Sequence, residues 1–184
     1  MVLNAAIAGC TSSENRPSTE TASPKPLPEI TPSKSEYFPD VEIIEKTTHM
    51  YANKQRVLRN YERVAYEEDL AKIARIHSND MAKRDFIGHD NPDGESHGDR
   101  LEKYGYDTHV SSEIITTYTP PYPAKTSIEE VAKYFVDSWM DSPPHRSAIL
   151  DEDYVEAGVG VCVTSDDFFY ATMLFSGRDT EIDG

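Results

Sequence analysis

The first periodic stretch of the chain begins after Pro39, where apolar side chains recur at three- and four-residue steps. The residues that share this spacing are Ile43, Ile44, Thr47, Met50, Tyr51, Val57 and Leu58. Such spacing places side chains on one face of an α-helix. Asp40 supplies a carboxylate suited to the N-cap. The pattern predicts an amphipathic helix over residues 41–59.

Two further helices are predicted by the same periodicity. One starts near the acids Glu67, Glu68 and Asp69, which suit the positive end of a helix dipole. Its apolar face consists of Leu70, Ile73, Ala74, His77 and Met81. The other starts at Ser127 with Glu130 three positions later, which is the pattern of a capping box. Its apolar face consists of Ile128, Val131, Ala132, Phe135, Val136 and Trp139.

Three shorter segments have the composition of β-strands. Residues 110–118 are rich in β-branched side chains, 157–164 form an apolar run, and 168–176 alternate aromatic and apolar residues. The polar residues 164–167 predict a hairpin turn between the last two. Helices on both sides of a small antiparallel sheet predict an α+β fold, a three-layer α-β-α sandwich.

Composition limits the function classes. A chain of 184 residues suits one domain with a tail. Its formal charge of −15 argues against nucleic-acid partners and anionic membrane surfaces, because both repel an acidic protein. The two cysteines are too few for a disulfide framework, and Cys162, in an apolar run, is predicted to be a small core residue.

The N-terminal region predicts an anchor and a spacer. Ile7-Ala8-Gly9-Cys10 resembles a lipobox, in which the cysteine receives a diacylglycerol, so residues 1–10 are interpreted as a truncated lipoprotein-type signal. A chance cluster of small residues is the alternative, because no basic region precedes it. Residues 11–39 are rich in Ser, Thr and Pro and predict a disordered tether, followed by a domain over 40–178 and a flexible tail over 179–184. We therefore expect an extracytoplasmic protein, lipid-anchored at the cell surface or secreted.

Two histidines follow predicted helices. His89 lies in Gly88-His89-Asp90-Asn91-Pro92-Asp93-Gly94, a segment dense in turn residues. His145 lies in Trp139-Met140-Asp141-Ser142-Pro143-Pro144-His145-Arg146-Ser147-Ala148-Ile149-Leu150, on an expected Pro-marked turn before the strand that contains Gly158-Val159-Gly160-Val161. For His89, sequence alone leaves a solvated surface histidine and a site histidine equally open. His145, just beyond a helix end and before a buried strand, is placed for a site.

These segments, together with Ile76–Ala82 and Phe86–Ile87, resemble the CAP superfamily, also called the SCP domain, and its microbial, cysteine-poor branch in particular. The similarity covers roughly residues 40–176 and implies an α-β-α sandwich. It also implies a tetrad of two histidines and two acids, which match His89, His145, Glu113 and Glu130. The family's Gly and Asn on either side of the first acid are replaced here by Ser112 and Ile114. Glu129 is an alternative to Glu130 as the second acid. A purely helix-capping role for Glu129 and Glu130 also stays open.

Two imidazoles and two carboxylates suit a divalent ion such as zinc, with a position left for water or a ligand. The acids have a second possible role, which is to orient the imidazoles. The same quartet also suits general acid and base chemistry, since histidine titrates near pH ~6.5. We expect zinc or another divalent cation and no organic cofactor. No His-Glu-x-x-His pattern supports the metal independently.

Other residues near these motifs are assigned structural roles. His77 lies on the apolar face of its helix, which indicates a hydrogen-bonded core histidine. Arg146 is expected to pair with an acidic neighbour such as Glu113. His97 is expected to be exposed in a loop.

The resemblance implies an extracytoplasmic protein that binds a small apolar or lipid-like ligand or a cell-surface partner. The alternatives are a metal-dependent or His/Glu-dependent hydrolase of peptidase type and a purely structural surface module. No serine or cysteine nucleophile stands in a recognisable motif, so binding is favoured over catalysis.

Overall fold

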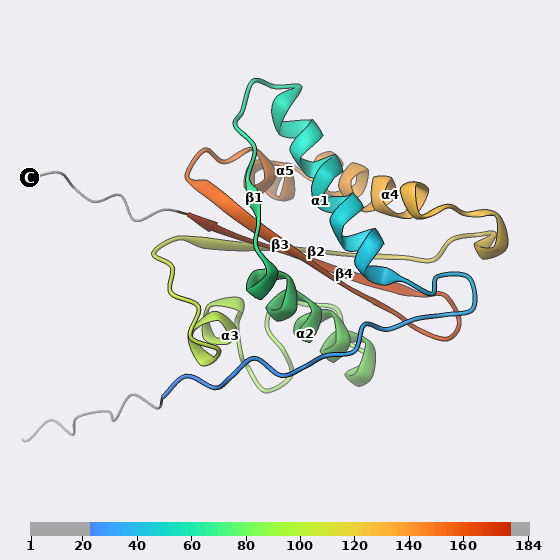
Figure 1. Cartoon of the computed structure of the whole chain (residues 1–184), viewed down its shortest axis with the longest axis horizontal. Helices are drawn as coiled ribbons and strands as arrows, with labels where there is room; N and C mark the ends of the chain where they lie inside the picture. Colours follow the sequence, from blue (N-terminus) through green and yellow to red (C-terminus); the bar gives the residue numbers. More distant parts are fainter. Residues whose placement is uncertain (1–22, 178–184) are drawn as a thin grey trace, which may run out of the picture.

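The computed structural model describes residues 23–177, and these contain five α-helices, one 3-10 helix and a four-stranded sheet (Figure 1). The α-helices are α1 (Val41–Val57), α2 (Glu68–Arg84), α3 (His97–Lys103), α4 (Ile128–Asp141) and α5 (Pro143–Leu150), and the 3-10 helix is η1 (Pro123–Lys125). The strands are β1 (Ala65–Tyr66), β2 (Ser111–Tyr118), β3 (Tyr154–Val163) and β4 (Phe169–Gly177). All three predicted helices and all three predicted strands are present. The face predicted for α1 is wrong, because polar side chains with partners inside the protein, such as Asn53 and Arg56, occupy its buried side. The predicted face is mostly exposed, and its exposed members are Ile43, Met50, Val57 and Leu58.

The strand order of the sheet is β1-β3-β4-β2. The two long pairings, β2 with β4 and β3 with β4, are antiparallel as expected. β1 was not predicted and pairs parallel with β3 at one edge. It has two residues, too few for a hydrophobic period to show in the sequence.

The helices cover both faces of the sheet, so the predicted α-β-α sandwich is confirmed. α1, α4 and α5 lie on one face, and α2 and α3 lie on the other (Figure 1). The larger core fills the first interface and includes Phe135, Trp139 and Phe175. Smaller clusters fill the second, and Cys162 is buried in one of them, as predicted.

Two helical segments differ from the expectations. His145 lies on α5 rather than on a turn, because Pro143 and Pro144 occupy its first turn, where their fixed φ and missing N–H cost little. His97 begins α3, a short helix with a capping box formed by Ser96 and Asp99. Both are brief helices in segments whose prolines, glycines and serines are typical of loops.

Two glycines of β3 let α2 pack directly against the sheet. A Cβ added to Gly160 would lie 1.9 Å from the backbone nitrogen of Arg75, and one on Gly158 would lie 2.1 Å from that of Ala71. Ser78 of α2 donates a hydrogen bond of 2.8 Å to the Gly160 carbonyl. The inner face of α2, and with it the neighbouring His77, is therefore held at a fixed distance from the sheet.

The outer edge of β3 is covered by side chains beyond the short pairing with β1. The buried Glu45 carboxylate of α1 accepts a 2.8 Å hydrogen bond from the Val161 N–H and forms an ion pair with Arg75. The Ser33 hydroxyl accepts a 2.8 Å bond from the Val163 N–H. These contacts satisfy backbone donors that an exposed sheet edge leaves free.

The predicted tether is described from residue 23 onward. Residues 23–39 form no helix or strand, but they contact the domain at several points. The Lys25 N–H donates to the Lys103 carbonyl, Ser33 contacts β3, and Phe38 is buried in the larger core. Cys10 and the rest of the predicted signal, residues 11–22 and the predicted tail lie outside the described residues. Within 23–177, no helix is long and apolar enough to cross a membrane.

Candidate functional site

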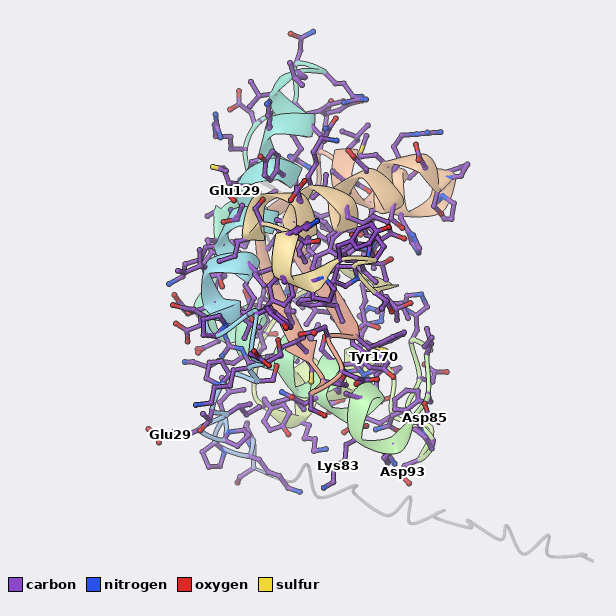
Figure 2. The ribbon with its side chains drawn as sticks, turned by 90° about the vertical axis from the view of Figure 1, so that its right-hand side faces the viewer. Glu29, Lys83, Asp85, Asp93, Glu129 and Tyr170 are labelled. Carbon is purple, nitrogen blue, oxygen red and sulfur yellow. The ribbon has the colours of Figure 1, made fainter. Side chains whose placement is uncertain are left out.

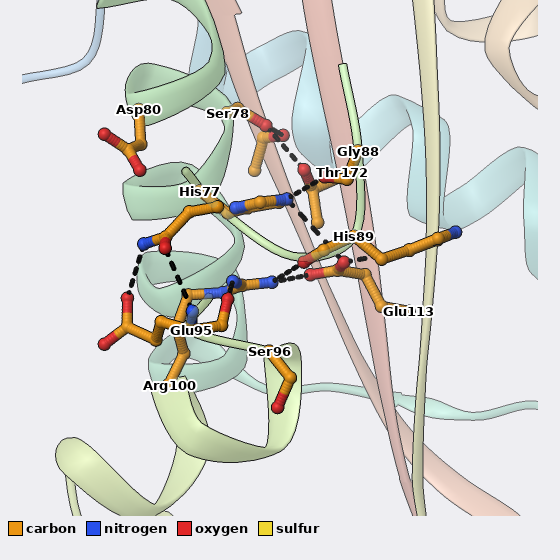
Figure 3. Close-up of polar contacts among 12 residues, drawn as sticks. His77, Ser78, Asp80, Gly88, His89, Glu95, Ser96, Arg100, Glu113 and Thr172 are labelled. Carbon is orange, nitrogen blue, oxygen red and sulfur yellow. Dashed lines mark hydrogen bonds and ion pairs between the residues drawn. The ribbon is translucent and has the colours of Figure 1, made fainter. Parts of the chain in front are cut away.

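Glu113 of β2 is the centre of a polar cluster at the edge of the sheet (Figure 3). Its carboxylate is buried, and its two oxygens have different partners. Oε1 lies 3.1 Å from Nδ1 of His89, and Oε2 accepts a 2.7 Å bond from Nη2 of Arg100. Burial alone raises the pKa of Glu113, but the hydrogen bond from His89 and the charge of Arg100 outweigh it and lower the pKa. The carboxylate is therefore ionised.

The loop that carries His89 begins where α2 ends. Asp85 adopts a left-handed conformation with φ 53° and stops the helix. Two successive carbonyls of the loop are then held by side chains. Nε2 of His77 lies 2.9 Å from the Gly88 oxygen, and Nη2 of Arg100 donates to the His89 oxygen at 3.1 Å. These bonds fix the backbone on both sides of the Cα of His89.

The contact with Glu113 also sets the tautomer of His89. An ionised carboxylate only accepts hydrogen bonds, so Nδ1 of His89 carries the proton and Nε2 of the neutral ring has a free lone pair. The His89 side chain is 49% exposed, which leaves this ring open to solvent. The hydrogen bond to Glu113 raises the pKa of His89 above its ordinary value. The result is an exposed imidazole with a buried carboxylate behind it.

His145 lies near His89 but comes from the opposite helical layer. It is half-buried on α5. Burial lowers the pKa of His145, and the neighbouring charge of His89 lowers it further. A loop after α2 and a helix after α4 thus bring two imidazoles to the same edge of the sheet.

The second predicted acid is placed elsewhere. The Glu130 carboxylate accepts a 2.7 Å bond from the Ser127 N–H, and the capping box read from the sequence is confirmed. Across residues 23–177, no hydrogen bond or ion pair joins Glu130 or Glu129 to either histidine, and no three His, Cys, Asp or Glu side chains converge closely enough to hold a metal. The structure brings His89 into contact with Glu113 and places His145 near His89. Glu130 instead caps α4.

The arginine that pairs with Glu113 is not the one expected from the sequence. Arg146 was expected to pair with Glu113, and this prediction is wrong, because its Nη1 donates to the Met140 carbonyl at the end of α4. Arg100 of α3 is the partner of Glu113 and is 1% exposed. Sequence reasoning missed Arg100 because α3 was not expected, although Ser96 and Asp99 give the spacing of a capping box.

An apolar hollow opens beside the His89 loop. It is lined by Ala82, Phe86, Ile87, Phe168 and Tyr170, with Asp85, Thr164 and Asp166 around them. Figure 2 shows Tyr170 and Asp85 on the same side of the molecule. Ile87, two residues before His89, is 63% exposed. The hollow therefore offers a concave apolar surface on the loop that carries His89, and its lining contains neither His89 nor His145.

Comparison with known proteins identifies the class to which this fold and site belong. The model of the CAP family, described as the cysteine-rich secretory protein family, matches residues 51–175. The chain belongs to this family.

Two relatives from Bacillus subtilis are similar in sequence. The uncharacterized membrane protein YlbC is 30% identical over 109 residues, which cover 59% of this chain and 29% of YlbC. The uncharacterized protein YkwD is 28% identical over 120 residues, which cover 65% of this chain and 43% of YkwD. The chain therefore spans less than half the length of these relatives.

Two solved structures share the fold. An outer surface protein of Borrelia burgdorferi superimposes with a TM-score of 0.65 at 20% identity, over 76% of this chain and 96% of that protein. An extracellular protein with an SCP domain from Bacillus anthracis gives a TM-score of 0.58 at 26% identity, over 73% of this chain and 40% of that protein.

Proposed function

We propose that this chain is an extracytoplasmic binding protein in which His89 and His145 hold a divalent cation such as zinc beside a small apolar or lipid-like ligand. The observation that carries the proposal is the hydrogen bond between His89 and the buried Glu113. A carboxylate behind an imidazole fixes the ring and makes the opposite nitrogen a better metal ligand. A bound cation would supply an electrophilic centre for a polar group of the ligand, and the apolar hollow beside Ile87 suits its hydrocarbon part.

The proposed cation site has two protein ligands, the imidazoles of His89 and His145, rather than the four residues of the expected tetrad. Neutral histidine nitrogens suit zinc, and positions not filled by protein are open to water or ligand. Both oxygens of Glu113 already accept hydrogen bonds, so its role is to orient His89. Glu130 is excluded from the proposed set because its carboxylate caps α4.

The test is a calorimetric zinc titration of the metal-stripped full chain and three variants. We expect one zinc per chain for the wild type, loss of binding in His89→Ala and in His145→Ala, and unchanged binding in His109→Ala, an exposed histidine of the same chain. Failure of the wild type to bind, or binding that ignores both site variants, would overturn the cation site. Native mass spectrometry of the purified protein then tests for a co-purified lipid.

A hydrolase is the second candidate, because the hydrogen bond that His89 donates to Glu113 makes His89 a stronger base. Hydrolysis of p-nitrophenyl acetate or casein that disappears in both His89→Ala and His145→Ala would favour it over the binding protein.

The location outside the cytoplasm is supported by similarity to proteins described as outer-surface and extracellular. We propose in addition that Cys10 carries the lipid anchor. Mass spectrometry of the native protein extracted from membranes would show a diacylglyceryl cysteine, and an unmodified Cys10 in a chain that retains Met1 would disprove the anchor.

A further inference from the structure

His77 is fully buried and touches both groups that hold His89. It lies on the inner face of α2, with 0% of its surface exposed. Its Nε2 is 2.9 Å from the Gly88 carbonyl oxygen and 3.7 Å from Oε1 of Glu113, the oxygen that also accepts from His89 (Figure 3). The ring therefore contacts the backbone before His89 and the carboxylate behind it.

The protonation of His77 follows from these partners. A carbonyl oxygen only accepts, so Nε2 carries the hydrogen. Burial lowers the pKa of His77, which keeps the ring neutral and leaves Nδ1 as a bare acceptor. Nδ1 is buried and has no hydrogen-bond partner within the described residues. An apolar side chain would fill this position without burying an unpartnered nitrogen. The histidine is therefore explained by its other nitrogen, the donor at Nε2.

We propose that His77 is a positioning residue for His89: its Nε2–H holds the Gly88 carbonyl and its ring packs against Glu113, so that His89 keeps its Nδ1–H on Glu113 and presents Nε2. The site that His77 serves is the one in the proposed function, and the inference rests on it to that extent. Arg100 does the same for the next carbonyl, that of His89.

The helix that carries His77 is suited to this role because it packs closely against the sheet. The neighbouring Ser78 bonds to the Gly160 carbonyl and to the Thr172 hydroxyl, each at 2.8 Å. The close approach at Gly160 removes any space for sliding toward β3. The hydrogen bond from His77 on α2 therefore holds the solvent-exposed His89 loop at a fixed position relative to the sheet.

The experiment compares three substitutions of His77 in the full chain. His77→Gln keeps an amide donor near the position of Nε2. His77→Asn also has an amide donor, but its shorter side chain does not reach the Gly88 carbonyl. His77→Phe fills the space with no donor. The control is His49→Phe, which removes another buried histidine, 8% exposed, from α1. The readouts are the ¹⁵N chemical shifts of the His89 ring in the metal-free protein and the dissociation constant for zinc.

For the wild type we expect ring shifts of the neutral Nδ1–H tautomer. His77→Phe and His77→Asn should shift His89 toward a mixture of tautomers and weaken zinc binding by roughly 10- to 100-fold. His77→Gln should stay within about threefold of the wild type, and His49→Phe should leave both readouts unchanged while lowering the thermal midpoint.

An unaltered His89 tautomer in folded His77→Asn or His77→Phe would overturn the inference. So would an equal change in His49→Phe, because the effect would then be a general loss of packing. If His77→Phe does not fold, the comparison of Asn with Gln decides. If the wild type binds no zinc, the proposed cation site fails, while the ring shifts still test the role of His77.

Discussion

Replacing Glu113 with glutamine tests the electrostatic core of the site with almost no change in shape. Each carboxylate oxygen accepts from a different donor, Nδ1 of His89 at 3.1 Å and Nη2 of Arg100 at 2.7 Å. A glutamine amide has only one oxygen. Whichever way it is turned, its NH₂ group faces one of these N–H donors, and the buried Arg100 loses its counter-charge.

The cost of this change is large because Arg100 is 1% exposed. Removing one partner of a buried ion pair costs about 3–5 kcal/mol. Arg100 keeps its bonds to the carbonyls of Glu95 and His89, so we expect the lower end, about 3 kcal/mol. For a domain of this size that corresponds to a fall in the thermal midpoint of roughly 6–12 °C.

The assay is differential scanning calorimetry together with the zinc titration. Glu113→Gln should melt earlier and bind zinc roughly 10- to 100-fold more weakly. Asp137→Asn is the matched control, since its pair with Lys133 is exposed and is worth at most about 1 kcal/mol. A Glu113→Gln protein that melts and binds like Asp137→Asn would refute the reasoning that the buried charge organises the site.

Three further outcomes follow from the described contacts. Gly160→Ala should lower the free energy of unfolding in urea by about 1–3 kcal/mol or more, because its Cβ would lie 1.9 Å from a backbone nitrogen of α2, whereas Gly98→Ala, whose Cβ meets nothing closer than 3.7 Å, should be nearly neutral. Glu130→Gln should lower stability by about 1 kcal/mol or less and leave the zinc titration unchanged, and a loss of zinc binding would return Glu130 to the site. In an NMR pH titration, His89 should titrate above its ordinary value of 6.5 and His145 below it, and His89→Ala should raise the pKa of His145. Because the pKa of His89 is raised on folding, its stabilising contribution is present below about pH 6.5 and is lost as the pH rises through the folded pKa. The pKa of His145 is lowered on folding, so its protonation has the opposite effect: the free energy of unfolding falls as the pH drops from about 6.5 through the folded pKa. Equal pKa values for the two rings would contradict the geometry.

The elements with a strong period were predictable from sequence, and the brief ones were not. α2 and α4 each bury a stripe of apolar residues long enough for the spacing to identify the helix. The spacing also located α1, but it indicated the wrong face, because the buried side of α1 is largely polar and Met50 and Leu58 are exposed. α3 and α5 have seven and eight residues, and their prolines, glycines and serines resemble loop composition. β1 is assembled only by pairing with β3, and no local signal marks it.

The site was predictable only in part for the same reason. His89 follows α2, Glu113 lies on β2, and His145 lies on α5 directly after α4, so all three stand on or next to elements with a clear pattern, and the structure brings them to one edge of the sheet. Arg100 depends on the unpredicted α3. His77 was correctly assigned to the core, but its contact with Glu113 depends on how closely α2 approaches β3, which spacing along one helix does not reveal.

The Ser33 and Phe38 contacts change where the domain has to be cut for any laboratory study. The family match starts at residue 51, inside α1, and the composition change suggests a boundary near residue 40. A fragment that begins at either point would lack the hydroxyl that accepts the Val163 N–H and the aromatic ring that packs 4.9 Å from that of Phe169. It would expose a strand edge able to pair with other molecules. We therefore expect a fragment that starts no later than Lys25 to be more stable than one that starts at residue 40 or 51.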